Sequence, residues 1–126
     1  MIGEILHERL ATFEATAALV DGRIYPVALP QEPVLPAIVY DEQSDDSGEG
    51  TGHIVRKRLR VICFALSYAQ AKQVGTAVLR AVRGYRREDT VPPLANMEDD
   101  SRNDAFIPER GFYGDFLSLS AWVVEE

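Results

Sequence analysis

The segment His53–Arg87 constrains the fold most, because it reads as one long β-strand that turns directly into an amphipathic helix. From Val55 to Leu66 the residues are β-branched, aromatic or long, and neither glycine nor proline interrupts them, as is typical of a half-buried strand. Side chains alternate between the two faces of a strand. One face then holds Leu59, Val61, Cys63 and Ala65, and the other holds Arg56, Arg58, Arg60, Ile62 and Phe64.

The second face of this strand begins with three arginines and ends with two large apolar residues. An antiparallel sheet that covers a core normally keeps its other face polar. The C-terminal segment Asp115–Glu125 repeats the apolar excess, because alternation places Phe116, Trp122 and Val124 on one side of it. Two strands therefore predict that something beyond the chain's own core covers the sheet. The predicted subunit or partner interface comprises Arg56, Arg58, Arg60, Ile62, Phe64, Phe116 and Trp122.

The helix that comes after the strand has clear signals at both ends. Ser67 and Gln70 form a capping-box pattern at its start, and Gly84 marks its end. Its apolar stripe, at three- and four-residue spacing, consists of Ala71, Val74, Val78, Ala81, Val82 and Tyr85. Small side chains in this stripe predict close packing of the helix on the sheet.

The remaining elements complete the predicted fold class. Apolar spacing predicts a first helix that runs to about Leu19 and stops at Asp21-Gly22. A proline-rich connection then leads to a strand that begins at Leu35, and Leu94–Asp104 is expected to form a polar edge strand. The order predicts a single α+β domain over residues 1–126, with two helices packed on one face of a mainly antiparallel, about four-stranded sheet.

The segment Asp41–Gly52 contains five acids and three glycines and lacks any hydrophobic residue. We expect a flexible loop or hairpin tip there, with Asp45, Asp46 and Glu49 as contacts to a partner. A calcium loop is the alternative, but the order of the acids does not match the EF-hand pattern. A solvated loop is therefore favoured.

Composition excludes several classes of function. The net charge of −7 argues against nucleic-acid binding as the main role, so Arg56, Arg58 and Arg60 are assigned to an interface or to cross-strand pairing with acids rather than to phosphate. The single cysteine, Cys63, rules out a disulfide framework and is expected to be a buried apolar residue. No secretory signal is visible and no apolar run approaches the ~20 residues that span a membrane, which predicts a soluble protein of a reducing cytoplasm.

The sequence contains none of the catalytic motifs that would identify an enzyme, such as G-x-S-x-G, a Walker loop, C-x-x-C or H-E-x-x-H. A second acidic cluster consists of Glu98, Asp99, Asp100 and Asp104, and it would need further ligands from the Asp41–Gly52 loop to hold a metal, so a solvated edge is favoured. We therefore predict a non-enzymatic protein without a cofactor, a metal site or catalytic residues.

Taken in order, these pieces resemble the tail terminator or tail-completion proteins of long-tailed phages, prophages and gene transfer agents. The similarity covers most of the chain. The segments that resemble the family are Asp21–Pro26, Leu35–Tyr40, Leu59–Phe64, Ser67–Ala71, Met97–Asp100, Gly111–Tyr113 and the final strand with Trp122. Family members often have a polar residue where Ile62 stands, and many have a shorter loop than Asp41–Gly52.

The resemblance implies a homohexameric ring on the head-proximal end of the tail tube, assembled in the bacterial host cytoplasm and located in the virion tail or neck. Its implied partners are the tail tube protein and the head–tail connector or stopper protein, and DNA would pass the lumen without specific binding. There is no implied membrane partner. The alternatives are another neck ring, such as a head-completion or connector protein, and a small-molecule-binding regulatory domain, which would need a pocket with convergent polar groups.

Overall fold

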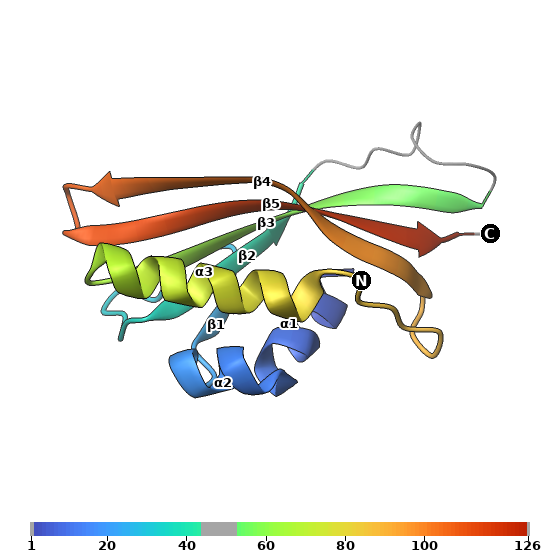
Figure 1. Cartoon of the computed structure of the whole chain (residues 1–126), viewed down its shortest axis with the longest axis horizontal. Helices are drawn as coiled ribbons and strands as arrows, with labels where there is room; N and C mark the ends of the chain where they lie inside the picture. The colour runs from blue at the N-terminus through green and yellow to red at the C-terminus, as the bar shows by residue number, and fades with distance from the viewer. Residues whose placement is uncertain (1, 44–52, 126) are drawn as a thin grey trace.

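The computed structural model describes residues 2–43 and 53–125. The helices are α1 (Ile2–Thr12), α2 (Glu14–Val20) and α3 (Tyr68–Val82), and the strands are β1 (Ile24–Pro26), β2 (Ala37–Glu42), β3 (Ile54–Ala65), β4 (Leu94–Ile107) and β5 (Phe112–Val124). The strands form one sheet in the order β1-β2-β3-β5-β4, antiparallel except for the β1–β2 pair. Figure 1 shows the three helices together on one side of this sheet. The predicted α+β class, with helices on one face of a mainly antiparallel sheet, is confirmed.

The prediction of one continuous first helix is wrong, because the helix breaks at Phe13. The backbone of Phe13 is extended (φ −72°, ψ 124°), and no side chain caps the start of α2. The buried hydroxyl of Thr16 donates to the backbone oxygens of Leu10 and Phe13, which satisfies carbonyl groups near the break. The predicted end is confirmed, since Asp21 and Gly22 both have positive φ and terminate α2.

The sheet has five strands rather than about four, because the short extended piece after α2 is itself a strand. β1 pairs in parallel with β2, with Ile24 opposite Ile38, and the amide of Ile38 donates to the carbonyl of Arg23. The proline-rich residues 27–36 form the connection between these two strands. The acidic loop also starts later than predicted, since Asp41 and Glu42 belong to β2.

The core lies between the helices and one face of the sheet. Leu59, Val61 and Cys63 of β3 are buried against Leu6, Leu10, Val74 and Val78 of the helices, together with Leu117 and Leu119 of β5. The predicted stripe of α3 is buried or half-buried, the Ser67 hydroxyl accepts from the Gln70 amide, and Gly84 has a φ of +73° just beyond the helix. The core faces predicted from alternation and from helical spacing are therefore confirmed.

β4 is the edge strand that the sequence predicts, and it runs three residues further than expected, to Ile107. The residues that follow α3 hydrogen-bond to the first part of β4. The Gly84 amide donates to the Met97 carbonyl, and Arg87 forms a β-bridge with Leu94. A β-bulge interrupts its pairing with β5 between Asp99 and Ser101.

None of the helices in the described part of the chain is long and apolar enough to cross a membrane.

Candidate functional site

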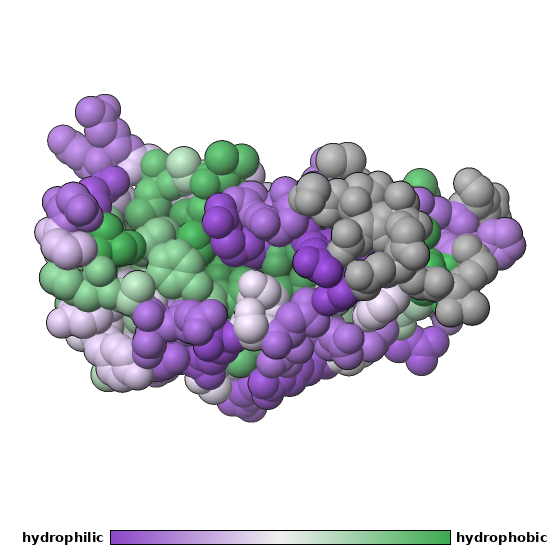
Figure 2. Space-filling model, turned by 90° about the horizontal axis from the view of Figure 1, so that it is seen from above, coloured by the Kyte–Doolittle hydropathy of each residue, from purple (hydrophilic) through white to green (hydrophobic). Residues whose placement is uncertain are grey.

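The outer face of the sheet, which is the face turned away from the helices, divides into a charged half and an apolar half. The β3–β5 register places Arg56 opposite Trp122 and Ile62 opposite Phe116. All seven residues of the predicted interface therefore belong to this one face. Figure 2 looks onto it and shows hydrophobic residues gathered toward the end where β3 finishes and β5 begins.

In the charged half, side chains of β3, β4 and β5 bind one another. The Arg56 guanidinium donates to the Ser120 hydroxyl at 2.7 Å and pairs with Asp100 at 3.1 Å. It also lies 5.8 Å from the centre of the Trp122 ring, whose indole N–H donates to Glu98. Arg56 and Trp122 are therefore held by partners within the chain.

The other two arginines of the row differ in burial from Arg56. Arg60 is exposed and pairs with Asp41 of β2 at 2.6 Å, so the cross-strand pairing with acids that the sequence suggested occurs for Arg56 and Arg60. Arg58 is exposed on the same face, opposite Ser120 in the register. The predicted loop contacts Asp45, Asp46 and Glu49 lie outside the described residues.

In the apolar half, β3 and β5 present four half-buried side chains, which are Ile62, Phe64, Phe112 and Phe116. Phe64 contacts Phe112 with ring centres 6.3 Å apart, and Ile62 lies opposite Phe116. Gly114 allows this arrangement, because a Cβ there would stand 2.8 Å from the Phe116 ring. Nothing in residues 2–43 and 53–125 buries Ile62, Phe64 or Phe116 fully, and these three side chains, with Phe112, form the apolar patch.

A hollow of about 220 Å³ adjoins the apolar patch. Ile62 and Phe64 form one side of it, and Leu29 of the proline-rich connection together with Val39 of β2 forms the other. Arg110, from the turn between β4 and β5, stands at its rim. The connection therefore shapes part of the outer face as well as joining β1 to β2.

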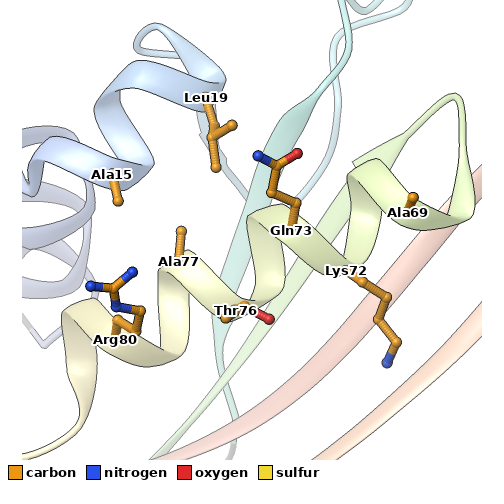
Figure 3. A pocket seen from close by; sticks show the side chains of 8 residues that line it. All are labelled: Ala15, Leu19, Ala69, Lys72, Gln73, Thr76, Ala77 and Arg80. Carbon is orange, nitrogen blue, oxygen red and sulfur yellow. The ribbon is translucent and has the colours of Figure 1, made fainter.

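The helix side of the molecule carries a groove of about 370 Å³ between α2 and α3. Figure 3 shows small side chains in it, such as Ala15 and Ala77, while Lys72 points away toward the sheet. Arg80 separates this groove from a neighbouring hollow beside Phe13. The polar residues that line the groove are Lys72, Gln73, Thr76 and Arg80, and all of them belong to α3. Since α2 contributes only Ala15 and Leu19, polar groups do not converge on the groove from two sides as they do in a small-molecule site.

A buried ionic cluster lies under α3, and it was not predicted from the sequence. The carboxylate of Asp115 is fully buried and receives two bonds from Arg102, at 2.9 Å and 2.8 Å, with Lys72 at 3.4 Å. Arg102 also donates to the Lys72 carbonyl and to the Thr76 hydroxyl. The alternation of β5 could have indicated this burial, because Asp115 lies two residues before the buried Leu117 and therefore on the same, core-facing side of the strand. The cluster joins α3, β4 and β5 and is a structural rather than an exposed site.

Two side chains that could support catalysis, Cys63 and His7, are buried or hydrogen-bonded within the chain. Burial raises the pKa of the Cys63 thiol, and the nearby Asp115 carboxylate raises it further, as expected for an inert cysteine. His7 is hydrogen-bonded to the Tyr40 hydroxyl at 3.0 Å. Among the described residues, no group of three or more His, Cys, Asp or Glu side chains is placed to hold a metal ion.

Similarity to known proteins places the chain among the structural proteins of virion tails. The family model described as "Tail completion protein gp17" matches residues 4–124, so the chain belongs to the tail completion protein gp17 family. The predicted membership of the tail-completion proteins is confirmed. The chain is thus a structural component of a virion tail and not an enzyme.

Among solved structures, the fold is similar to a chain of a structure described as "Virion of native gene transfer agent (GTA) particle". The two chains are 19% identical and superpose with a TM-score of 0.72, over 94% of this chain and 91% of the other. At this identity the likeness shows a shared fold. No curated protein sequence matches the chain significantly.

Proposed function

We propose that the chain, folded as one domain, forms a homohexameric ring at the head-proximal end of a tail tube. There the ring ends tube polymerisation and presents a surface to the head–tail connector or stopper protein. The family description supports a role in completing a tail, and the gene-transfer-agent particle provides a virion in which a protein of this fold is present.

The observation that carries the proposal is the apolar patch on the outer face. Ile62, Phe64 and Phe116 remain half-buried, although each is large and apolar. A contiguous apolar surface on a folded domain marks a protein contact, and copies of one chain that contact each other through two different surfaces close into a ring when the rotation permits. The net charge of −7 suits a lumen that DNA crosses without binding.

The first test is the native mass of the purified protein, combined with negative-stain electron microscopy, alone and after addition of the tube protein. Six copies of the 14.0 kDa chain give about 84 kDa, and we expect six-fold rings of that mass and shorter tubes in their presence. Rings that bind the connector but not the tube would identify a different ring of the neck. A protein that stays monomeric and leaves tube length unchanged would refute the proposal.

Phe64→Glu tests whether the apolar patch is the contact. We expect loss of the oligomer with a far-ultraviolet circular dichroism spectrum like that of the wild type, because Phe64 lies on the outer face and outside the main core. Ala18→Glu, on the exposed side of α2, is the matched control and should assemble normally. Trp122 is a poorer test position, since its replacement also removes its contacts with Arg56 and Glu98. A Phe64→Glu protein that still forms rings would exclude the patch from the interface.

A further inference from the structure

The backbone at Val27 adopts a conformation that valine rarely takes. Its φ is +72°, and the Ala28 amide donates to the Pro26 carbonyl at 2.8 Å, which closes a three-residue turn around it. A γ-turn of this hand is strained, especially for a β-branched residue. The Val27 amide bonds to the Tyr40 carbonyl of β2, so the turn is fixed to the sheet. Such strained residues concentrate at functional sites.

The turn holds Val27 at the rim of the hollow that adjoins the apolar patch. The Val27 side chain is 73% exposed, and it borders a hollow of about 220 Å³ whose walls include Leu29, Ile62 and Phe64. The hollow is therefore an apolar recess with a raised apolar rim. It is of a size to receive an aliphatic side chain from outside.

The charge beside the hollow indicates what would accompany that side chain. Arg110 stands at the rim, and its guanidinium stacks on Phe112 at 5.0 Å. It forms no ion pair with any residue of the described chain. A fitting occupant is an exposed aliphatic residue with a carboxylate close to it.

The chain itself displays such a residue at the opposite end of the sheet. Val91 is 89% exposed, the largest exposed fraction among the large hydrophobic residues described. Glu88, three residues earlier, has a side chain that is 92% exposed and a single loose pairing with Arg86 at 3.9 Å. The Thr90 hydroxyl donates to the Pro92 carbonyl, which helps to fix the turn that presents Val91. Figure 1 shows this turn between α3 and β4, at the end of the sheet away from the β4–β5 turn.

We propose that Val91 of one copy enters the hollow of the next copy, with Glu88 facing Arg110. This inference rests on the proposed ring and identifies which surfaces of the two copies meet in it. The turn that carries Val91, here called the tip, lies at the opposite end of the sheet from the hollow, so Val91 cannot enter the hollow of its own chain. Each added copy presents a new tip and a new hollow, so the contact is heterologous and repeats until a ring closes.

Cysteine cross-linking tests the contact directly. Val91→Cys and Ala28→Cys are made singly and together, and Cys63 gives little background because it is buried. Under mild oxidation we expect a covalent dimer when the two single variants are mixed, and a ladder of multimers from the double variant. Val91→Cys combined with Ala18→Cys, on the helix side, should give no ladder. Native mass measured on the same samples reports separately whether the oligomer exists.

A charge reversal provides the second readout. Arg110→Glu should weaken association by several-fold, and Glu88→Arg in the same chain should restore much of it, because the pair is then reversed rather than broken. An intact ring that forms no cross-link, or a double variant that associates no more tightly than either single variant, would refute the proposed Val91 contact but not the ring. Absence of any oligomer, with and without the tube protein, would overturn both the contact and the proposed ring.

Discussion

Gly75→Ala in α3 is expected to destabilise the protein, although the same change in most helices is favourable. Alanine is preferred over glycine in a helix interior by about 1 kcal/mol. At position 75, however, a Cβ would collide with one carboxylate oxygen of Asp115 and stand 2.8 Å from its carboxyl carbon. Glycine is therefore required here by the close approach of α3 to the buried carboxylate.

The expected magnitude depends on how firmly the carboxylate is held. Arg102 binds Asp115 through two nitrogens, at 2.9 Å and 2.8 Å, and Lys72 approaches it at 3.4 Å. Moving the carboxylate weakens these bonds, and leaving it in place forces α3 away from the sheet. Overpacking typically costs about 1–3 kcal/mol, and loss of one partner from a buried ion pair costs about 3–5 kcal/mol. Since Arg102 remains partly exposed and the pair is only disturbed, we expect a net loss of about 2 kcal/mol after the helix preference is subtracted.

Urea unfolding followed by circular dichroism, at two protein concentrations, measures this loss. Gln73→Ala, on the exposed side of the same helix, is the control and should change stability by only a few tenths of a kcal/mol. In an Asp115→Ala background the Gly75→Ala change should become neutral or favourable, because the atoms that clash are gone. A Gly75→Ala protein at least as stable as the wild type would refute the reasoning.

Two further predictions concern ionisable groups. Hydrogen bonds from Arg83 lower the pKa of Asp99 from its ordinary value of 3.8, so the unfolded chain takes up the proton first as pH falls. The pair therefore stabilises the folded protein at pH values above 3.8, and this stabilisation is lost as the pH falls through the lowered pKa of Asp99. In Arg83→Gln, the free energy of unfolding should depend less on pH in the acidic range. An unchanged dependence would contradict this. Cys63 is buried and its pKa is raised, so a thiol reagent at mildly alkaline pH should label it only after unfolding in urea. Prompt labelling of the folded protein would show instead that the reagent reaches the core side of β3.

The parts of the fold that depend on local periodicity could be predicted from the sequence. Alternation in β3 and β5 assigns both faces correctly, because a strand exposes every second side chain to the same side. The break at Phe13 could not be predicted in this way, since the apolar positions keep helical spacing across it and no capping side chain marks it. β1 was missed as a strand because its evidence is the pairing of Ile24 with Ile38, which is not local.

The Asp115 cluster shows the same limit for the candidate sites. Its members come from α3, β4 and β5, and the bulge between Asp99 and Ser101 shifts the alternation that would have placed Arg102. An aspartate is usually exposed, and Asp115 is buried here because Arg102 of β4 and Lys72 of α3 compensate its charge. The outer face was easier to predict, because two strands carry its apolar excess independently. Whether that face is the interface stays a prediction.

The free edge of β4 has a consequence for how copies of this chain can add to one another. A long unpaired strand usually invites another strand to extend the sheet, and such growth has no natural end. Here Gly84 and Arg87 already occupy part of the ladder from Leu94 to Met97, and the bulge after Asp99 bends the rest of the strand. The run from Ser101 to Ile107 remains open to an incoming strand, and the exposed Asp104 within it is a charge of the kind that opposes pairing at a sheet edge. Fibre-like polymerisation by merging sheets is thereby disfavoured, and association is left to side-chain contacts, which can be finite in number.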